Sequence, residues 1–117
     1  MYLKDLAKLV ISYKTPFEMT KYDFCNYETQ FMLHSFRNWA IDEILNDILD
    51  GMCYEECRMK VELPIDAIDY MERWRNVMDE FACIAKTSEA NAMFSVAYDL
   101  CVEILDDIIV LEREESK

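Results

Sequence analysis

The sequence predicts an all-α fold: a compact antiparallel bundle of about four helices that forms a single domain over residues 1–117. The chain contains only one Gly and two Pro, whereas sheet-rich folds need Gly, Pro or Asn-Gly turns at short intervals. A chain of this length also buries roughly two-thirds of its unfolded surface without disulfides or metals. A fold of helices joined by few, short connections therefore explains the shortage of Gly and Pro.

The first half of the chain predicts a short helix followed by a long one. Apolar residues recur at helical spacing at the start, namely Leu3, Leu6, Leu9, Val10 and Tyr13. Thr15, Pro16 and Glu18 then form a helix-start pattern, with Thr15 as N-cap and Glu18 completing a capping box. No Gly or Pro follows until Gly51, a natural C-terminal stop. One long helix would fit, but mediocre helix formers favour a break near Thr20–Glu28.

The connection in the middle of the chain is ambiguous. Met52–Leu63 forms either a short helix that carries Cys53 and Cys57 or an irregular connector. Charged and apolar residues alternate at the C-terminal end of this segment, which is compatible with a short strand. We discount the strand because no partner strand is evident. Pro64 then opens the next helix, with Asp66 in its first turn.

A heptad seam is the strongest helix signal in the second half. Apolar residues step by 4, 3, 4, 3 and 4 along Ala67, Met71, Trp74, Met78, Phe81 and Ala85, as in antiparallel bundles. Lys86–Ser88 is predicted to turn the chain, with Thr87 or Ser88 capping a last helix. That helix runs to about Arg113, before a frayed tail over Glu112–Lys117. Because no strong break forces the turn, one continuous helix from Pro64 stays an alternative.

The last helix is apolar nearly all round. Its main stripe consists of Met93, Ala97, Leu100, Cys101, Ile104, Ile108 and Leu111. Three valines lie on or beside the opposite face, namely Val96, Val102 and Val110. Such a helix is either buried on several sides or lies at a subunit interface. Central burial and a homodimer contact are therefore both open.

Acidic residues are concentrated after residue 40. Residues 1–40 sum to +1, whereas residues 41–117 sum to −13. This asymmetry indicates that the chain binds another macromolecule by charge. A net charge of −12 argues against direct binding to nucleic acid or to an anionic membrane, because like charges repel. The expected partner is a protein with a basic surface.

Two acidic ladders are the candidate partner-binding residues. The first ladder is Glu43, Asp47 and Asp50; the second is Asp99, Glu103 and Asp106, with Asp107 beside them. Each steps by 4 and 3, so its carboxylates share one helix face, about 5–6 Å apart, a spacing of the same order as phosphates along a strand. No base lies between Arg37 and Arg58, or between Lys86 and Arg113. The alternative interpretation is a solvated face of an acidic protein.

Aromatic residues gather early in the chain. Eight of the fifteen are Tyr13, Phe17, Tyr22, Phe24, Tyr27, Phe31, Phe36 and Trp39. They are explained either by core packing or by a patch that binds a partner or lines a ligand site. Stacking on bases would need more Lys and Arg than this segment has.

The cysteines and the N-terminal segment predict a cytoplasmic protein. The odd set of Cys25, Cys53, Cys57, Cys83 and Cys101 forms no disulfide framework, so we expect free thiols in a reducing compartment. The first residues are interrupted by charges and do not resemble a signal peptide. The longest uncharged run, Ala90–Tyr98, is shorter than the ~18 residues of a membrane span.

No cofactor, metal site or catalytic centre is predicted. His34 is the only histidine, and a lone histidine amid aromatics is more often packed or exposed than catalytic. Cys53 and Cys57 could share a helix face, but a structural zinc site needs four ligands. The sequence holds no Gly-rich phosphate loop, no Gly-x-Ser-x-Gly and no kinase motif. We therefore expect a protein that is not an enzyme.

In size, charge and helix content the chain resembles, as a type, the small acidic helical inhibitors that phages and mobile elements make against host nucleases. The anti-CRISPR and anti-restriction proteins are of this type. The resemblance implies that the ladders imitate nucleic-acid phosphates and occupy a basic site on a nuclease or another nucleic-acid-binding protein. The alternative is a helical adaptor, or a homo-oligomeric structural or regulatory protein, with an apolar contact surface. In that case the acidic residues serve only solubility.

Overall fold

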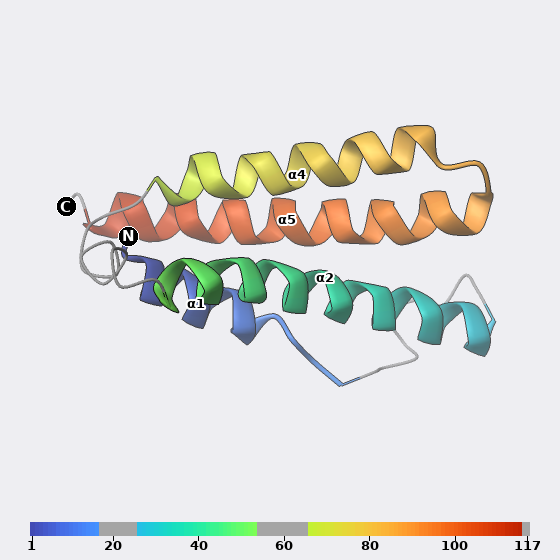
Figure 1. The fold of residues 1–117 in the computed structure, drawn as a ribbon, viewed down its shortest axis with the longest axis horizontal. Coiled ribbons are helices and arrows are strands. Elements are labelled where there is room, and N and C mark those ends of the chain that lie inside the picture. Colours follow the sequence, from blue (N-terminus) through green and yellow to red (C-terminus); the bar gives the residue numbers. More distant parts are fainter. Residues whose placement is uncertain (17–25, 54–65, 116–117) are drawn as a thin grey trace.

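The computed structural model describes residues 1–16, 26–53 and 66–115, with the backbone alone for residues 51–53. The described residues form four helices that pack against one another, which confirms the predicted all-α bundle. The helices are α1 (Leu3–Ser12), α2 (Tyr27–Cys53), α4 (Ala67–Ile84) and α5 (Ser88–Glu115). Successive helices alternate in direction, and α5 lies between α4 and α2 in the view of Figure 1.

α1 confirms the helix predicted from the first apolar repeat, and its buried face carries Leu6 and Val10. The helix start predicted at Thr15 lies mostly outside the described residues. Within them, α2 begins at Tyr27, inside the interval where a break was predicted. The Asn26 side-chain oxygen accepts a hydrogen bond from the backbone N–H of Thr29 at 2.8 Å. This is an N-cap, so Asn26 starts α2 rather than merely weakening a longer helix.

The C-terminal end of α2 differs from the prediction. The helix continues through Gly51 to Cys53, so Gly51 does not stop it. A Gly inside a helix costs only about 1 kcal/mol of stability relative to Ala. A single Gly near the end of a helix is therefore not enough to break it. The alternatives for Met52–Leu63 lie outside the described residues, apart from Met52 and Cys53 at the end of α2.

Side-chain caps define the hairpin of α4 and α5. Asp66 accepts from the backbone N–H of Asp69 at 2.9 Å, so it is the N-cap of α4 and not a first-turn residue as predicted. The start at Pro64 lies outside the described residues. The Thr87 hydroxyl accepts from the backbone N–H of Ala90 at 3.0 Å and caps α5, as predicted. The alternative of one continuous helix is therefore wrong, and α5 extends to Glu115, beyond the predicted end.

Replacing the α4 cap tests this boundary. We expect Asp66→Ala to lower the free energy of unfolding by about 1 kcal/mol, because the first-turn N–H groups lose their acceptor. Urea unfolding followed by circular dichroism measures the change. Asp66→Ser restores a cap and should recover most of the loss. An unchanged midpoint for Asp66→Ala would contradict the role of this residue as the cap.

The core is centred on α5, which packs along both α4 and α2, while α1 packs on α2. Its buried residues include Leu6, Val10, Ile41, Ile44, Ile48, Met71, Met78, Leu100, Cys101, Ile104 and Ile108. The apolar stripe predicted for the last helix is thus mostly buried within one chain, while Val110 stays exposed on the other side. No helix in the described ranges is both long and apolar enough to cross a bilayer.

The heptad seam predicted on α4 is buried only in part. Ala67, Met71 and Met78 are fully buried, but Phe81 is 44% exposed. A helix of 3.6 residues per turn drifts by about 20° per heptad relative to a 3.5-residue repeat. Phe81 lies two heptads after Ala67, so it has rotated from the α5-facing side toward the edge of the contact.

Side chains of α2 hold the segment that follows α1. His34 Nε2 and Asn38 Nδ2 both donate to the carbonyl oxygen of Thr15, at 2.7 and 3.0 Å. The Arg37 guanidinium donates to the carbonyl oxygen of Tyr13 at 2.7 Å. His34 and Arg37 are buried. The only histidine is therefore a packed side chain that holds the segment after α1 at Thr15.

The buried thiol of Cys101 predicts a loss of stability at alkaline pH. Burial raises the pKa of Cys101 from 9.0 to about 12, against an opposing contribution from Arg75. Below pH 9 both folded and unfolded thiols are protonated; above it only the unfolded thiol ionises, so stability falls as pH rises toward the native pKa. We expect the parent to lose about 1 kcal/mol more than Cys101→Ala between about pH 8 and pH 10. Urea unfolding under reducing conditions measures this, and equal losses would contradict it.

Candidate functional site

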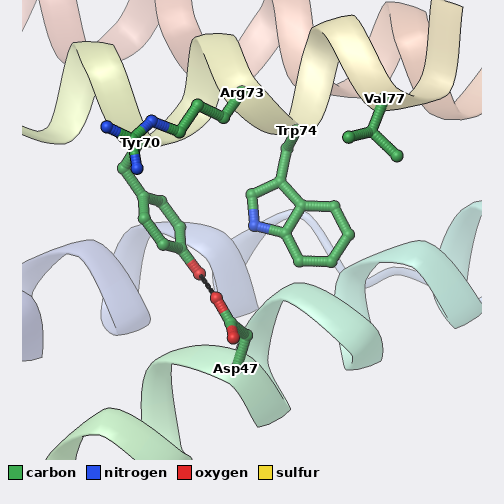
Figure 2. Close-up of a pocket in the computed structure, with 5 residues that line it drawn as sticks. All are labelled: Asp47, Tyr70, Arg73, Trp74 and Val77. Carbon is green, nitrogen blue, oxygen red and sulfur yellow. Dashed lines mark hydrogen bonds between the residues drawn. The ribbon is translucent and has the colours of Figure 1, made fainter. Parts of the chain in front are cut away.

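The first ladder lies on the exposed surface of α2. The side chains of Glu43, Asp47 and Asp50 are all exposed. Asp47 has a long-range partner that its sequence neighbourhood does not supply, because the Tyr70 hydroxyl of α4 donates to its carboxylate at 2.5 Å (Figure 2). This hydrogen bond fixes one carboxylate of the ladder against α4.

The second ladder lies on α5 and is likewise exposed at Asp99, Glu103, Asp106 and Asp107. The Tyr13 hydroxyl, next to the end of α1, donates to the Asp107 carboxylate. Each ladder therefore has one carboxylate in or beside it that is bonded by a tyrosine from elsewhere in the fold. Asp47 of the first ladder is bonded from α4, and Asp107 beside the second ladder is bonded from the residue that follows α1.

The ladder carboxylates have no cationic partner among the described residues. The ion pairs of this part of the chain are Lys14–Asp42, at 2.9 Å, and Arg73–Asp69, at 2.9 Å. Neither pair includes a ladder residue. Both ladders thus present negative charge to solvent without local neutralisation by the described lysines and arginines.

A pocket of about 320 Å³ lies between α2 and α4, beside the first ladder. We call it the α2–α4 pocket; it is lined by Asp47, Tyr70, Arg73, Trp74 and Val77. Figure 2 shows Tyr70 and Trp74 projecting from α4 toward Asp47 on α2. None of the sequence patterns described above predicts this pocket, although Tyr70, Trp74 and Val77 step by 4 and 3 on one face of α4.

The tyrosine in this pocket is held in its neutral form. Burial, followed by the hydrogen bond to Asp47, raises the pKa of Tyr70 well above its ordinary value, against an opposing contribution from Trp74. At neutral pH the hydroxyl therefore keeps its proton and donates it to the carboxylate. Asp47 stays available as an acceptor on its remaining lone pairs.

The early aromatic residues divide between core and surface. Three lie outside the described residues: Phe17, Tyr22 and Phe24. Three others are exposed: Tyr27, Phe31 and Trp39. Tyr13 and Phe36 pack against the core. Core packing therefore explains only part of the group.

An aromatic cluster crosses from α2 over α5 to α4. Phe36 stacks on Trp39 with ring centroids 4.9 Å apart and meets Phe94 edge-on at 5.1 Å. Phe94 stacks in turn on Phe81 at 5.1 Å. The end rings, Trp39 and Phe81, are 46% and 44% exposed. Large aromatic rings that are rigidly packed yet half exposed are the kind of side chain that anchors protein interfaces.

The described thiols and acidic groups form no metal centre. Cys83 is exposed, Cys101 is buried, and both are free thiols. In the part of the chain that the structure describes, no three His, Cys, Asp or Glu side chains are grouped so that they could hold a metal ion. The side chain of Cys53, together with Cys25 and Cys57, lies outside that part.

Comparison with known proteins adds no relative. No protein-family model, no curated protein and no solved structure matches this chain.

Proposed function

We propose that this chain is a non-catalytic, cytoplasmic protein-binding module that docks on the basic nucleic-acid-binding site of a partner protein and inhibits it. The observation that carries the proposal is the exposure of all seven ladder carboxylates without a cationic partner among the described residues. Unneutralised like charges on one helix face repel each other and cost stability. A basic partner surface would relieve that repulsion.

Two tyrosines make the ladders suitable for recognition by position as well as by charge. Tyr70 holds Asp47, and Tyr13 holds Asp107. Fixed carboxylates lose less side-chain entropy on binding than free ones do. Each ladder thus offers a partner at least one acceptor in a defined place, as a phosphate backbone does.

The second candidate function is a helical adaptor or homo-oligomer with an apolar contact. The observation in its favour is the set of exposed apolar side chains, which includes Trp39, Phe81, Ile84 and Val110. An apolar contact depends weakly on ionic strength, whereas a charge-driven one weakens steeply. Salt therefore separates the two functions.

The deciding experiment is capture from host lysate on the immobilised full chain at about 50 mM salt, followed by elution with either about 500 mM salt or duplex DNA. The proposal expects a retained nucleic-acid-binding protein that both eluents release. A partner that stays bound at high salt and is not released by DNA would contradict the proposal and favour the adaptor. Sedimentation of the chain alone at both salt concentrations tests for the homo-oligomer.

A further inference from the structure

The α2–α4 pocket has the size and the walls of a site for a single side chain. Its volume of about 320 Å³ is at the lower end of the roughly 300–1,000 Å³ that ligand pockets span. Trp74 and Val77 give it an apolar wall on α4, and Asp47 gives it a carboxylate on α2. A long side chain with an apolar stem and a charged end fits such a combination.

The charges around the pocket favour a cationic end. Asp47 accepts from Tyr70, and an ionised carboxylate has about four lone-pair sites, so acceptor capacity remains. Arg73 lies on the rim, is largely exposed, and is paired with Asp69 at 2.9 Å. The positive charge nearest the pocket is therefore already engaged, and the first ladder adds further negative charge beside it. The indole ring of Trp74 presents a face on which a cation can stack.

An apolar row leads away from the pocket along α4. Val77, Phe81 and Ile84 step by 4 and 3 and are all exposed, with Ile84 70% exposed. Trp39 joins this row from α2 through the aromatic cluster. A partner helix with apolar residues at i, i+3, i+4 and i+7 covers such a row.

We propose that the α2–α4 pocket receives an arginine side chain from an amphipathic helix of the basic partner, whose apolar residues cover Val77, Phe81 and Ile84. The inference rests on the proposed function and names the contact that gives it specificity. Arginine fits better than lysine, because its planar guanidinium both stacks on an indole and bonds a carboxylate with two N–H groups. A second copy of the chain is the poorer occupant, since each copy carries a net charge of −12.

The test uses a capped helical peptide of about twelve residues that carries one arginine followed by leucines at i+3, i+4 and i+7. A matched peptide replaces arginine by citrulline, which keeps the shape and removes the charge. The two tryptophans of the chain are Trp39 and Trp74, and both lie at the proposed contact, so intrinsic fluorescence reports binding. Asp47→Asn is compared with Asp79→Asn, which makes the same charge change at an exposed acid outside both ladders.

We expect the arginine peptide to change the tryptophan emission and to bind at least about tenfold more tightly than the citrulline peptide. Asp47→Asn should weaken its binding about tenfold, and Asp79→Asn less than about twofold. Equal losses in the two variants, equal binding of the two peptides, or no binding of the arginine peptide would each overturn the inference. Any of these results leaves the proposed function intact if the captured partner is still released by salt and DNA.

Discussion

Reversing the charge of the second ladder is expected to abolish binding of the captured partner while leaving the fold intact. In the triple variant Asp99→Lys, Glu103→Lys and Asp106→Lys, three attractive contacts with a basic surface become repulsive. We expect the affinity at low salt to fall by at least about a hundredfold, because like charges juxtaposed across an interface cost several kcal/mol. Isothermal titration calorimetry with the purified partner measures the loss.

The second ladder gives the cleaner test because of its contacts. Asp99, Glu103 and Asp106 make no side-chain hydrogen bond or ion pair with another described residue, and all three are exposed. Reversing the first ladder should also weaken binding, but it removes the Tyr70–Asp47 hydrogen bond, worth about 1 kcal/mol. Stability and affinity would then change together.

A control triple variant separates ladder position from net charge. Asp79, Glu80 and Glu114 are exposed acids outside both ladders, and their reversal to Lys changes the net charge by the same amount. Neutral Asn and Gln versions of the second ladder should lose part of the affinity, since their shape remains. If the control triple weakens binding as strongly as the ladder triple, net charge alone drives the interaction and the ladders are not the binding site.

Truncating the centre of the core should produce the largest loss of stability. Ile104 lies on the stretch of α5 that packs against the rest of the bundle and is 0% exposed. We expect Ile104→Ala to lower the free energy of unfolding by about 2–5 kcal/mol, from the lost burial and the cavity left behind. That is a large share of the roughly 5–15 kcal/mol that stabilises a domain. Thermal and urea unfolding measure the change.

The matched control is Ile84→Ala, the same substitution in an exposed position at the end of α4. Ile84 is 70% exposed, so the substitution removes little buried surface and should change the free energy of unfolding by less than about 0.5 kcal/mol. The same variant should weaken binding of the partner if Ile84 belongs to the contact. A loss at Ile84 as large as that at Ile104 would mean that Ile84 is buried, for instance in a homodimer.

The helices were predictable wherever a signal is local. Thr87 and Ser88 are the two caps that the sequence predicts for the last helix, and Thr87 is the one observed, because a hydroxyl three residues before an N–H bonds it within a single turn. Errors arose where local signals compete. By propensity Asn26 is only a weak helix former, yet its side chain caps α2. Gly51 predicts a helix stop, yet α2 continues through it. Within one helical turn, the stabilisation from a cap and the cost of a poor helix former differ by only about 1 kcal/mol. Tertiary packing therefore decides where the helix begins and ends.

The all-α bundle and the two helical ladders of acidic residues can be read from the chain alone. Both follow from spacing along one helix, and exposure of the ladders follows because isolated carboxylates are costly to bury. Only the packing of the helices brings Tyr70 to Asp47 and Tyr13 to Asp107. It also decided that Trp39 and Phe81 end one aromatic cluster beside a pocket. Contacts between residues far apart in sequence depend on how the helices are rotated and offset against one another, and no periodicity within a single helix encodes that placement.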